Sequence, residues 1–232
     1  MKTLPIILGI ARSAAGNSSL LQKSKPLAPE QKQAIFERDD FTCSCCGFKS
    51  ARYQEVFHID RNLSNNTASN LATICQFCHQ CFDLEQVVSM KSGFLIWMPE
   101  TDQATLNHLA RALYIARVSQ GPMADAARRM LDIVMTRRED AKRRLHTDDP
   151  YVLAAVMRDF LNSRTYAERN DRLNGVRLFP LDRRMVREGD LEFNQFPQIL
   201  AYWRSKDGPF GGRLPVQWLD HFKDMMREQG AA

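Results

Sequence analysis

Hydrophobic positions in the first hundred residues predict one short helix and two separate strands. Residues 29–39, PEQKQAIFERD, begin with a proline, which is tolerated in a first helical turn because no N–H is needed there, and place Ala34, Ile35 and Phe36 inward. Residues 53–59, YQEVFHI, and 93–99, GFLIWMP, are rich in β-branched and aromatic side chains, which favour strands. The polar stretch 61–70, RNLSNNTASN, predicts a loop.

From residue 101 onward the hydrophobic spacing becomes that of amphipathic helices. A first helix has Thr101 as its candidate cap and is ended by Gly121-Pro122. Its apolar positions recur at helical spacing: Leu106, Leu109, Ala110 and Leu113. Further helices are predicted over residues 123–145, 151–161 and 164–173, and VRLFPL at 176–181 is extended. The pattern predicts an α+β protein with a mainly α-helical C-terminal half.

The N-terminal residues 4–10, LPIILGI, are a short apolar run that contains Pro5 and Gly9. The run faintly resembles a signal peptide but is short for an export core, so we predict a strand. No apolar run approaches the roughly 20 residues needed to span a bilayer. We expect a strand and linker at 1–28, a compact core at 29–100, and a helical partner-binding region at 101–232 packed on that core.

Composition adds a mild basic excess to this picture. The chain has 232 residues, of which 44% are hydrophobic and 25% are charged, and its net charge is +5. Residues 121–187 alone contain 15 Lys and Arg against 10 Asp and Glu. This stretch has three interpretations: a solvated helix face, a docking surface for an acidic partner or the inner leaflet of a membrane, or a DNA-binding helix around 128–144.

All six cysteines lie between residues 43 and 81, and four of them form two C-x2-C motifs. Cys43 and Cys46 make the first, and Cys75 and Cys78, 28 residues further on, make the second. Two such turns supply four sulfurs in a tetrahedron with no open position, which is a structural metal site rather than a catalytic one. We therefore predict one structural Zn²⁺ ion, because reduced core cysteines or a redox pair explain the spacing less well. Clustered thiols also favour the cytoplasm, where disulfides do not compete with metal.

Two further thiols make the ligand set ambiguous. Cys45 lies beside the first pair, and Cys78 and Cys81 form a C-x2-C of their own. Gly47, directly after Cys46, suits a tight knuckle, so we assign Cys43, Cys46, Cys75 and Cys78 as ligands and leave Cys45 and Cys81 as spare thiols.

Residues 29–82 resemble the HNH nuclease family. The matching stretches are FERDDFTCSCCG, FHI and SNNTASNLATICQFCH, about a quarter of the chain. The resemblance implies a ββα-metal core, in which His58 is the general base, Asn70 steadies the loop, and His79 is a ligand of the catalytic metal.

One residue departs from that pattern. The position before the base holds His or Asp in the family as a second metal ligand, but here it is Phe57, whose ring cannot coordinate an ion. His58 is then either a base or a structural histidine at the end of a strand, and the missing ligand favours the second interpretation. Asp60 does not replace the ligand, because strand alternation places it on the face opposite Phe57.

The flanking residues extend the resemblance to the IcmJ/DotN family of type IVB secretion systems. The shared stretches include IFERDDFTCSCCGF, NNTASNL, CQFCHQCF, LIWMPE and GVRLFP, and the similarity weakens after about Met185. The family implies a cytoplasmic, zinc-bound adaptor of the coupling complex at the inner membrane. There it binds the C-terminal extension of the coupling ATPase, contacts other coupling subunits and aids effector export, with no need for nuclease chemistry.

Three hypotheses about function follow. The first is this adaptor, in which Trp203, Phe210 and Trp218 in the tail either belong to the core or fill a groove on a partner. The second is an HNH-type, metal-dependent DNA endonuclease that uses His58, Asn70 and His79. The third is a protein that binds nucleic acid without cutting it, through the basic helix.

Overall fold

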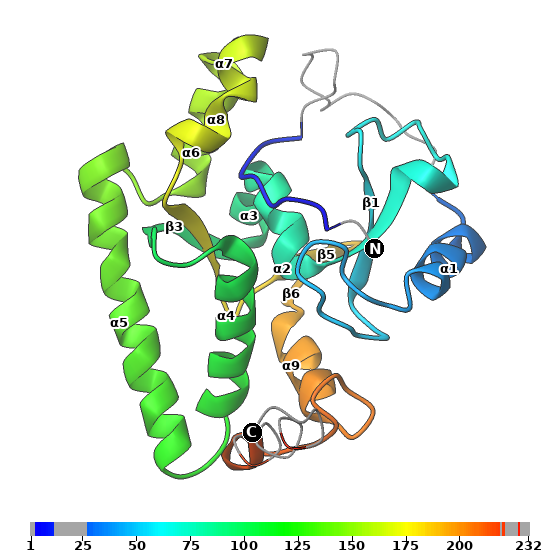
Figure 1. The fold of residues 1–232 in the computed structure, drawn as a ribbon, viewed down its shortest axis with the longest axis vertical. Coiled ribbons are helices and arrows are strands. Elements are labelled where there is room, and N and C mark those ends of the chain that lie inside the picture. The colour runs from blue at the N-terminus through cyan, green and yellow to red at the C-terminus, as the bar shows by residue number, and fades with distance from the viewer. Residues whose placement is uncertain (1–2, 12–26, 219, 221–226, 228–232) are drawn as a thin grey trace.

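The first half of the chain contains three strands, three α-helices and two short 3₁₀ turns. The computed structural model describes residues 3–11, 27–218, 220 and 227. In chain order these elements are α1 (Pro29–Arg38), β1 (Gln54–His58), η1 (Ala68–Asn70), β2 (Leu71–Cys75), α2 (Gln76–His79), η2 (Gln80–Phe82), α3 (Leu84–Met90) and β3 (Gly93–Trp97) (Figure 1).

The second half is mainly helical, as the pattern predicted. Its elements are α4 (Gln103–Arg117), α5 (Pro122–Leu145), α6 (Pro150–Asp159), α7 (Ser163–Ala167), α8 (Arg169–Arg172), β4 (Val176–Pro180), β5 (Met185–Glu188), β6 (Leu191–Asn194), α9 (Phe196–Arg204) and η3 (Pro215–Gln217). Helices α4 and α5 run side by side, because Gly121 at φ +80° and Pro122 turn the chain between them (Figure 1).

The strands of the described residues form three antiparallel pairs. In the first pair, β1 and β2 place Phe57 opposite Ala72 and His58 opposite Leu71. The second pair joins β3 to β4, which are adjacent in space although about 80 residues separate them in the chain. The third is the β5–β6 hairpin. The β3–β4 pair therefore ties the N-terminal half to the segment that follows the helices.

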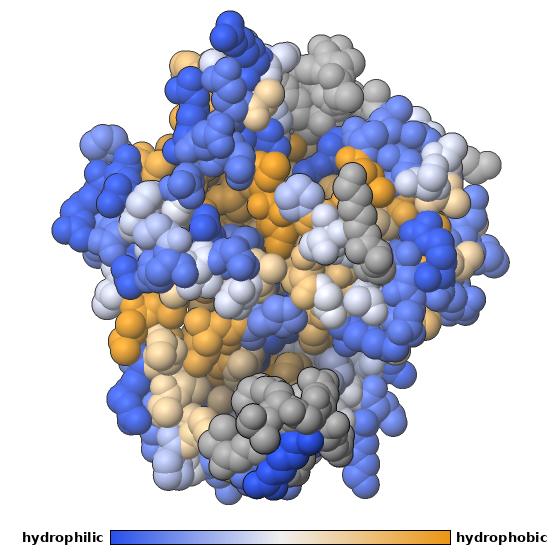
Figure 2. All heavy atoms as spheres, in the orientation of Figure 1, coloured by the Kyte–Doolittle hydropathy of each residue, from blue (hydrophilic) through white to orange (hydrophobic). Residues whose placement is uncertain are grey.

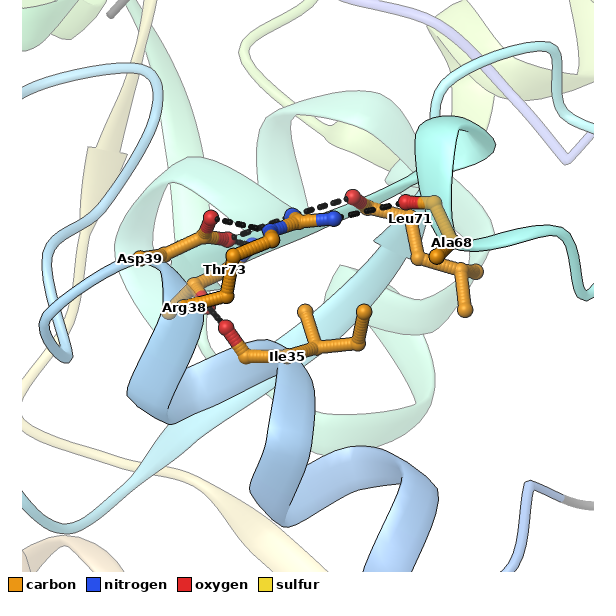
Figure 3. A network of polar contacts seen from close by, with 6 residues as sticks. All are labelled: Ile35, Arg38, Asp39, Ala68, Leu71 and Thr73. Atoms are coloured by element: carbon orange, nitrogen blue, oxygen red, sulfur yellow. Dashed lines mark hydrogen bonds and ion pairs between the residues drawn. The ribbon is translucent and has the colours of Figure 1, made fainter.

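A polar network fixes the end of α1 against β2. The guanidinium of Arg38 donates to the carbonyls of Ala68 (2.6 Å) and Leu71 (2.7 Å) and pairs with Asp39 (Figure 3). The Asp39 carboxylate in turn accepts from the backbone N–H of Thr73 at 2.8 Å. Burial alone would raise the pKa of Asp39, but these hydrogen bonds outweigh it and lower the pKa. The network thus fixes the position of β2, whose last residue is Cys75.

Buried residues from both halves form one large hydrophobic cluster. It runs from the cysteine segment through α4 and β4 to α9, and includes Phe48, Phe77, Tyr114, Phe179 and Trp203. On the face shown in Figure 2, hydrophobic residues gather around the N-terminal segment and between α4 and α5, while polar residues cover the outer parts of the view. The cysteine segment is thus packed directly against the helices.

Several expected elements differ from the structure. Residues 4–10 are extended but form no strand, because their backbone bonds go singly to two different segments: Leu4 to Ser44, and Gly9 to Cys81 and Leu84. Asp102, rather than Thr101, caps α4 by accepting from Thr105 N–H at 2.7 Å. The predicted helix at 164–173 is two short ones, α7 and α8. Most of the predicted linker, residues 12–26, lies outside the described part of the chain.

Several elements were not predicted from the hydrophobic pattern. They include β2, α3, the β5–β6 hairpin and α9. Helix α9 buries Phe196, Ile199 and Trp203. Trp203 therefore belongs to the core and is not free to fill a groove on a partner. Phe210 and Trp218 are partly buried and stack on each other, with ring centroids 5.6 Å apart.

Candidate metal centre

The structure brings together the four cysteines that the spacing singled out. The Sγ atoms of Cys43, Cys46, Cys75 and Cys78 all lie within 4.8 Å of one another, and three of the four residues are buried. Four sulfurs at this separation can surround a single ion. Cysteine is a soft ligand that suits Zn²⁺ or another thiophilic metal, so the donor set fits the ion that the sequence predicts.

The first pair sits on a tight backbone knuckle. Cys43 donates its N–H to the carbonyl of Phe48 at 3.0 Å, and Gly47 donates back to the carbonyl of Cys43 at 2.9 Å. Gly47 has a φ of +74°, which glycine adopts without steric cost. This turn carries the side chains of Cys43 and Cys46 to the same side.

The second pair sits where a buried strand runs into a helix. All five residues of β2 are buried, and its last residue, Cys75, is the N-cap of α2. Cys78 follows within the first turn of α2. Because α2 starts directly at Cys75, the two sulfurs lie on one side of that turn.

Helix α4 adds polar side chains around the sulfurs that the sequence did not single out. Arg111 donates from Nη2 to Cys75 Sγ at 2.6 Å, and Asn107 donates from Nδ2 to Cys78 Sγ at 3.4 Å. Nε2 of His108 lies 2.8 Å from the carbonyl oxygen of Cys46. Gln103, one turn before Asn107, donates to Asn107 Oδ1 at 3.0 Å. Gln103, Asn107 and Arg111 follow each other at four-residue spacing, which is the signal that sequence analysis missed.

The guanidinium of Arg111 is the positive charge of this site. Its side chain is 1% exposed and lies over the ring of Phe48, with the guanidinium carbon 4.1 Å from the ring centroid. Burial alone would lower the pKa of Arg111, but the charges of Cys75 and Cys46 outweigh it and raise the pKa. Four thiolates and one divalent ion carry a formal charge of −2, so a buried cation beside them reduces the cost of that charge.

The thiols interact strongly with one another. Hydrogen bonds from neighbouring cysteines, Cys45 first among them, lower the pKa of Cys43, whereas hydrogen bonding to Cys43 and the other thiols raises the pKa of Cys78. Thiolates rather than thiols bind a metal ion, so metal binding at this cluster would release protons.

Cys45 and Cys81 lie outside the set of four but close to it. Cys45 is buried, and its interaction with Cys43 raises its pKa. Cys81 is fully buried and its thiol donates to the carbonyl of Phe77 at 3.2 Å. Both behave as packed thiols in this arrangement.

The residues that match the nuclease pattern lie near one another without forming a metal site. His58 and His79 both line a cavity of about 220 Å³ beside the β1–β2 hairpin. His58 Nε2 lies 2.9 Å from Asn66 Oδ1. Asn70 faces the loop instead, where it donates to Asp60 Oδ1 at 2.8 Å and accepts from the Asp60 N–H.

Nδ1 of His79 pairs with a carboxylate. It lies 2.8 Å from Oε2 of Glu55, whose other oxygen accepts from Arg184 at 2.7 Å. Burial would raise the pKa of Glu55, but the charge and hydrogen bond of His79, together with Arg184, lower it to about 2. Conversely, burial would lower the pKa of His79, but Glu55 raises it.

Phe57 occupies the floor of the same cavity. Its ring stacks on Phe82, with centroids 4.7 Å apart, and meets the ring of His79 edge to face at 6.1 Å. The guanidinium of Arg61 lies over both phenyl rings. The cavity that His58 and His79 line therefore also presents a hydrocarbon surface and a guanidinium, neither of which is an oxygen ligand for a hard divalent cation.

Sequence comparison identifies a curated relative. The chain is 34% identical over 154 residues to the type 4 apparatus protein DotN of Legionella pneumophila, and the match covers 64% of this chain and 71% of DotN. The chain belongs to the IcmJ/DotN family of type IV secretion proteins. The predicted family is thus confirmed, while a scan of protein-family models gives no match.

Membership of the IcmJ/DotN family makes this chain a homologue of a type IV secretion apparatus component. Among the described residues, no helix is both long and apolar enough to cross a membrane.

Proposed function

We propose that this IcmJ/DotN protein is a non-catalytic, zinc-bound adaptor subunit of the coupling complex of a type IVB secretion system. In this role it binds the C-terminal extension of the coupling ATPase and aids effector export. It works in the cytoplasm and reaches the inner membrane through its partners. The similarity to DotN supports an apparatus role.

The proposed metal ligands are Cys43, Cys46, Cys75 and Cys78, around one structural Zn²⁺. The 4.8 Å limit on their Sγ separations supports this assignment. When bound, the ion joins the knuckle that precedes β1 to the β2–α2 junction. Such a link stabilises a small fold by about 10 kcal/mol of apparent binding free energy.

The adaptor role is favoured over the endonuclease by the cavity beside His58. The order β1, β2, α2 is consistent with an HNH-like ββα unit, which we propose for residues 29–100. Catalysis in such a unit needs a divalent ion to stabilise the leaving oxygen. Phe57 and Arg61 line that cavity with an aromatic ring and a guanidinium in place of oxygen ligands. This is the observation that carries the proposal.

The helical region, residues 101–232, is the proposed partner-binding part. Helix α6 exposes an apolar row on one face, formed by Val152, Val156 and Phe160 at its end, the last with 80% of its surface accessible. Because monomeric proteins rarely expose such rows, this face supports a role in binding.

Co-purification from the native host tests the proposal. We expect the wild-type protein to retain the coupling ATPase and about one zinc per chain. The double variant Cys75→Ser/Cys78→Ser should lose both, because it removes half of the ligands. Cys45→Ser is the matched control, since it changes a neighbouring buried thiol and leaves the four ligands intact.

Two results would contradict the adaptor. One is a zinc-bound protein that recovers no secretion ATPase. The other is plasmid nicking in the presence of Mg²⁺, Mn²⁺ or Ni²⁺ that disappears in His58→Ala, which would favour the endonuclease.

A further inference from the structure

Arg61 lines the cavity beside the β1–β2 hairpin, and no carboxylate among the described residues forms an ion pair with it. Its guanidinium carbon is 4.5 Å from the ring centroid of Phe57 and 4.4 Å from that of Phe82. Its hydrogen bond to a described residue is long, 3.5 Å from Nη1 to the carbonyl of Phe82. A guanidinium carries five N–H donors, so most of its donor capacity is unused within the described part of the chain.

The environment of Arg61 is unfavourable for an isolated cation. Burial lowers its pKa to about 10, the phenol of Tyr166 and the carboxylate of Asp83 raise it, and the like charge of Arg169 lowers it further. Its backbone has a φ of +63°, a left-handed conformation that is uncommon for a residue with a side chain. Both features indicate that the position of this charge is maintained at some cost in stability.

Three carboxylates near the cavity have hydrogen-bond or ion-pair partners other than Arg61. Asp60 accepts from the backbone of Asn62 and from the side chains of Asn65 and Asn70. Asp83 caps α3 by accepting from the N–H of Gln86 at 3.2 Å. Glu55 lies between His79 and Arg184. Of these three acids only Asp83 lines the cavity, and none of the hydrogen bonds or ion pairs described here joins them to the guanidinium of Arg61, whose fork can bind another anion.

The rim and size of the cavity indicate what kind of anion fits. Leu63, two residues after Arg61, lines the cavity and is 38% exposed, and Ile59, two residues before Arg61, is 41% exposed. The cavity volume of about 220 Å³ is below the roughly 300 Å³ at which pockets for whole small molecules begin. A single side chain with apolar neighbours suits these dimensions better than a nucleotide does.

We propose that the Arg61 cavity receives an aspartate or glutamate side chain from an acidic segment of a partner protein. The guanidinium binds the carboxylate through its two-pronged fork while the phenyl rings of Phe57 and Phe82 hold it in place. Ile59 and Leu63 contact apolar residues that flank the acid in the partner. This inference rests on the proposed adaptor function and assigns one binding point to it.

Isothermal titration of the full chain with the purified C-terminal extension of the coupling ATPase tests the inference. Arg61→Gln should weaken binding by at least about tenfold, because a charge-assisted hydrogen bond to a desolvated carboxylate is lost. Lys32→Gln is the matched control: this exposed lysine of α1 carries the same charge, and its loss should change the affinity by less than about twofold. Leu63→Ser should give a smaller loss than Arg61→Gln.

Folding of each variant is measured by thermal unfolding. If Arg61→Gln does not fold, Leu63→Ser and Arg61→Lys take its place, since the first alters only the rim and the second keeps the charge while removing the fork. Weaker binding by both folded variants supports the inference.

Three outcomes would overturn the inference. Equal affinity of wild type and Arg61→Gln for the extension would show that the Arg61 cavity does not take part in binding, while the adaptor function would stand. Absence of binding by the wild type would overturn both proposals. Arg61-dependent binding of a DNA duplex, in place of the peptide, would show that the cavity takes a phosphodiester instead.

Discussion

Arg111 is a buried cation surrounded by hydrophobic residues. The nearby cysteine sulfurs explain how its charge is stabilised there. Its Nη2 atom lies 2.6 Å from Cys75 Sγ, and the surrounding surface consists of Phe48, Phe77 and Trp203. The aromatic faces offset part of the desolvation of the guanidinium. The thiolates supply the opposite charge, and the cation lowers the cost of placing four of them together.

Replacing Arg111 by methionine should destabilise the protein and loosen the metal site. We expect the free energy of unfolding to fall by about 3 kcal/mol, because one partner of a buried charge pair is removed. Release of zinc to a chromophoric chelator should be faster than in wild type. The control is Arg117→Met on the same helix, whose pair with Asp182 is partly exposed and should contribute about 1 kcal/mol or less. Equal effects of the two variants would contradict this role of Arg111.

The sequence predicted the sulfurs of the site but not its cation. The C-x2-C spacing is local, so it identifies Cys43, Cys46, Cys75 and Cys78 without knowledge of the fold. Arg111 follows Cys75 by 36 positions and lies in a helix with other polar residues. Only the packing of α4 on the cysteine segment distinguishes it from a solvated arginine.

At the scale of elements, Gly175 connects helix α8 to strand β4, which pairs with β3. Gly175 has a φ of +86°, and a Cβ atom there would lie 2.6–2.9 Å from the ring of Trp97 on β3. The N–H of Met98 donates to the carbonyl of Gly175 at 2.8 Å. The close approach of this backbone to the Trp97 ring therefore depends on the absence of a side chain.

Gly175→Ala should destabilise the protein more than Gly121→Ala does. Both glycines have positive φ, but the Cβ atom at Gly121 would meet nothing within 4 Å. We expect about 1 kcal/mol for the backbone strain at either position and a further 1–3 kcal/mol at Gly175 for the steric clash. Urea unfolding of the two variants measures the difference, and equal midpoints would show that Trp97 moves aside without cost.

Prediction of the elements depended on how much of their stabilisation is local. Helix α5 was predicted within one residue because Pro122 marks its start and its apolar spacing continues over many turns. Helix α9 was missed, since its nine residues, FPQILAYWR, start with a Phe-Pro pair and gain their stability from burying Phe196, Ile199 and Trp203 against other segments. Residues 4–10 were expected to form a strand, but no neighbouring strand is available to pair with them.

At the scale of the whole molecule, the cysteine segment and the helices share one hydrophobic cluster. Cys43, Cys75 and Cys78 belong to the same cluster as Leu106 and Tyr114 of α4 and Ile199 of α9. Loss of the metal would leave the thiols and Arg111 in this cluster without their central charge. The helices then lose the surface on which they pack.

Removal of the metal should therefore unfold both halves together. We expect a chelator to lower the midpoint of thermal unfolding and to remove helical circular dichroism in a single transition, because zinc binding contributes to the free energy of folding. Zn²⁺ should restore the signal and Mg²⁺ should not, since the ligands are thiolates. A helical signal that survives chelation with its own later transition would show that the helices fold independently.

The sequence by itself determined the four sulfurs, the helical second half and the family, because ligand spacing, apolar periodicity and shared residues are all readable along the chain. Only the tertiary structure decided what surrounds those sulfurs and what fills the cavity beside His58. Arg111 and Arg61 are both ordinary charged residues in the sequence. The packing of distant segments places the guanidinium of Arg111 against the cysteine sulfurs and that of Arg61 in a cavity. The desolvation of a charged side chain depends on the residues that surround it in the folded protein, so the fold determines the role of these two charges.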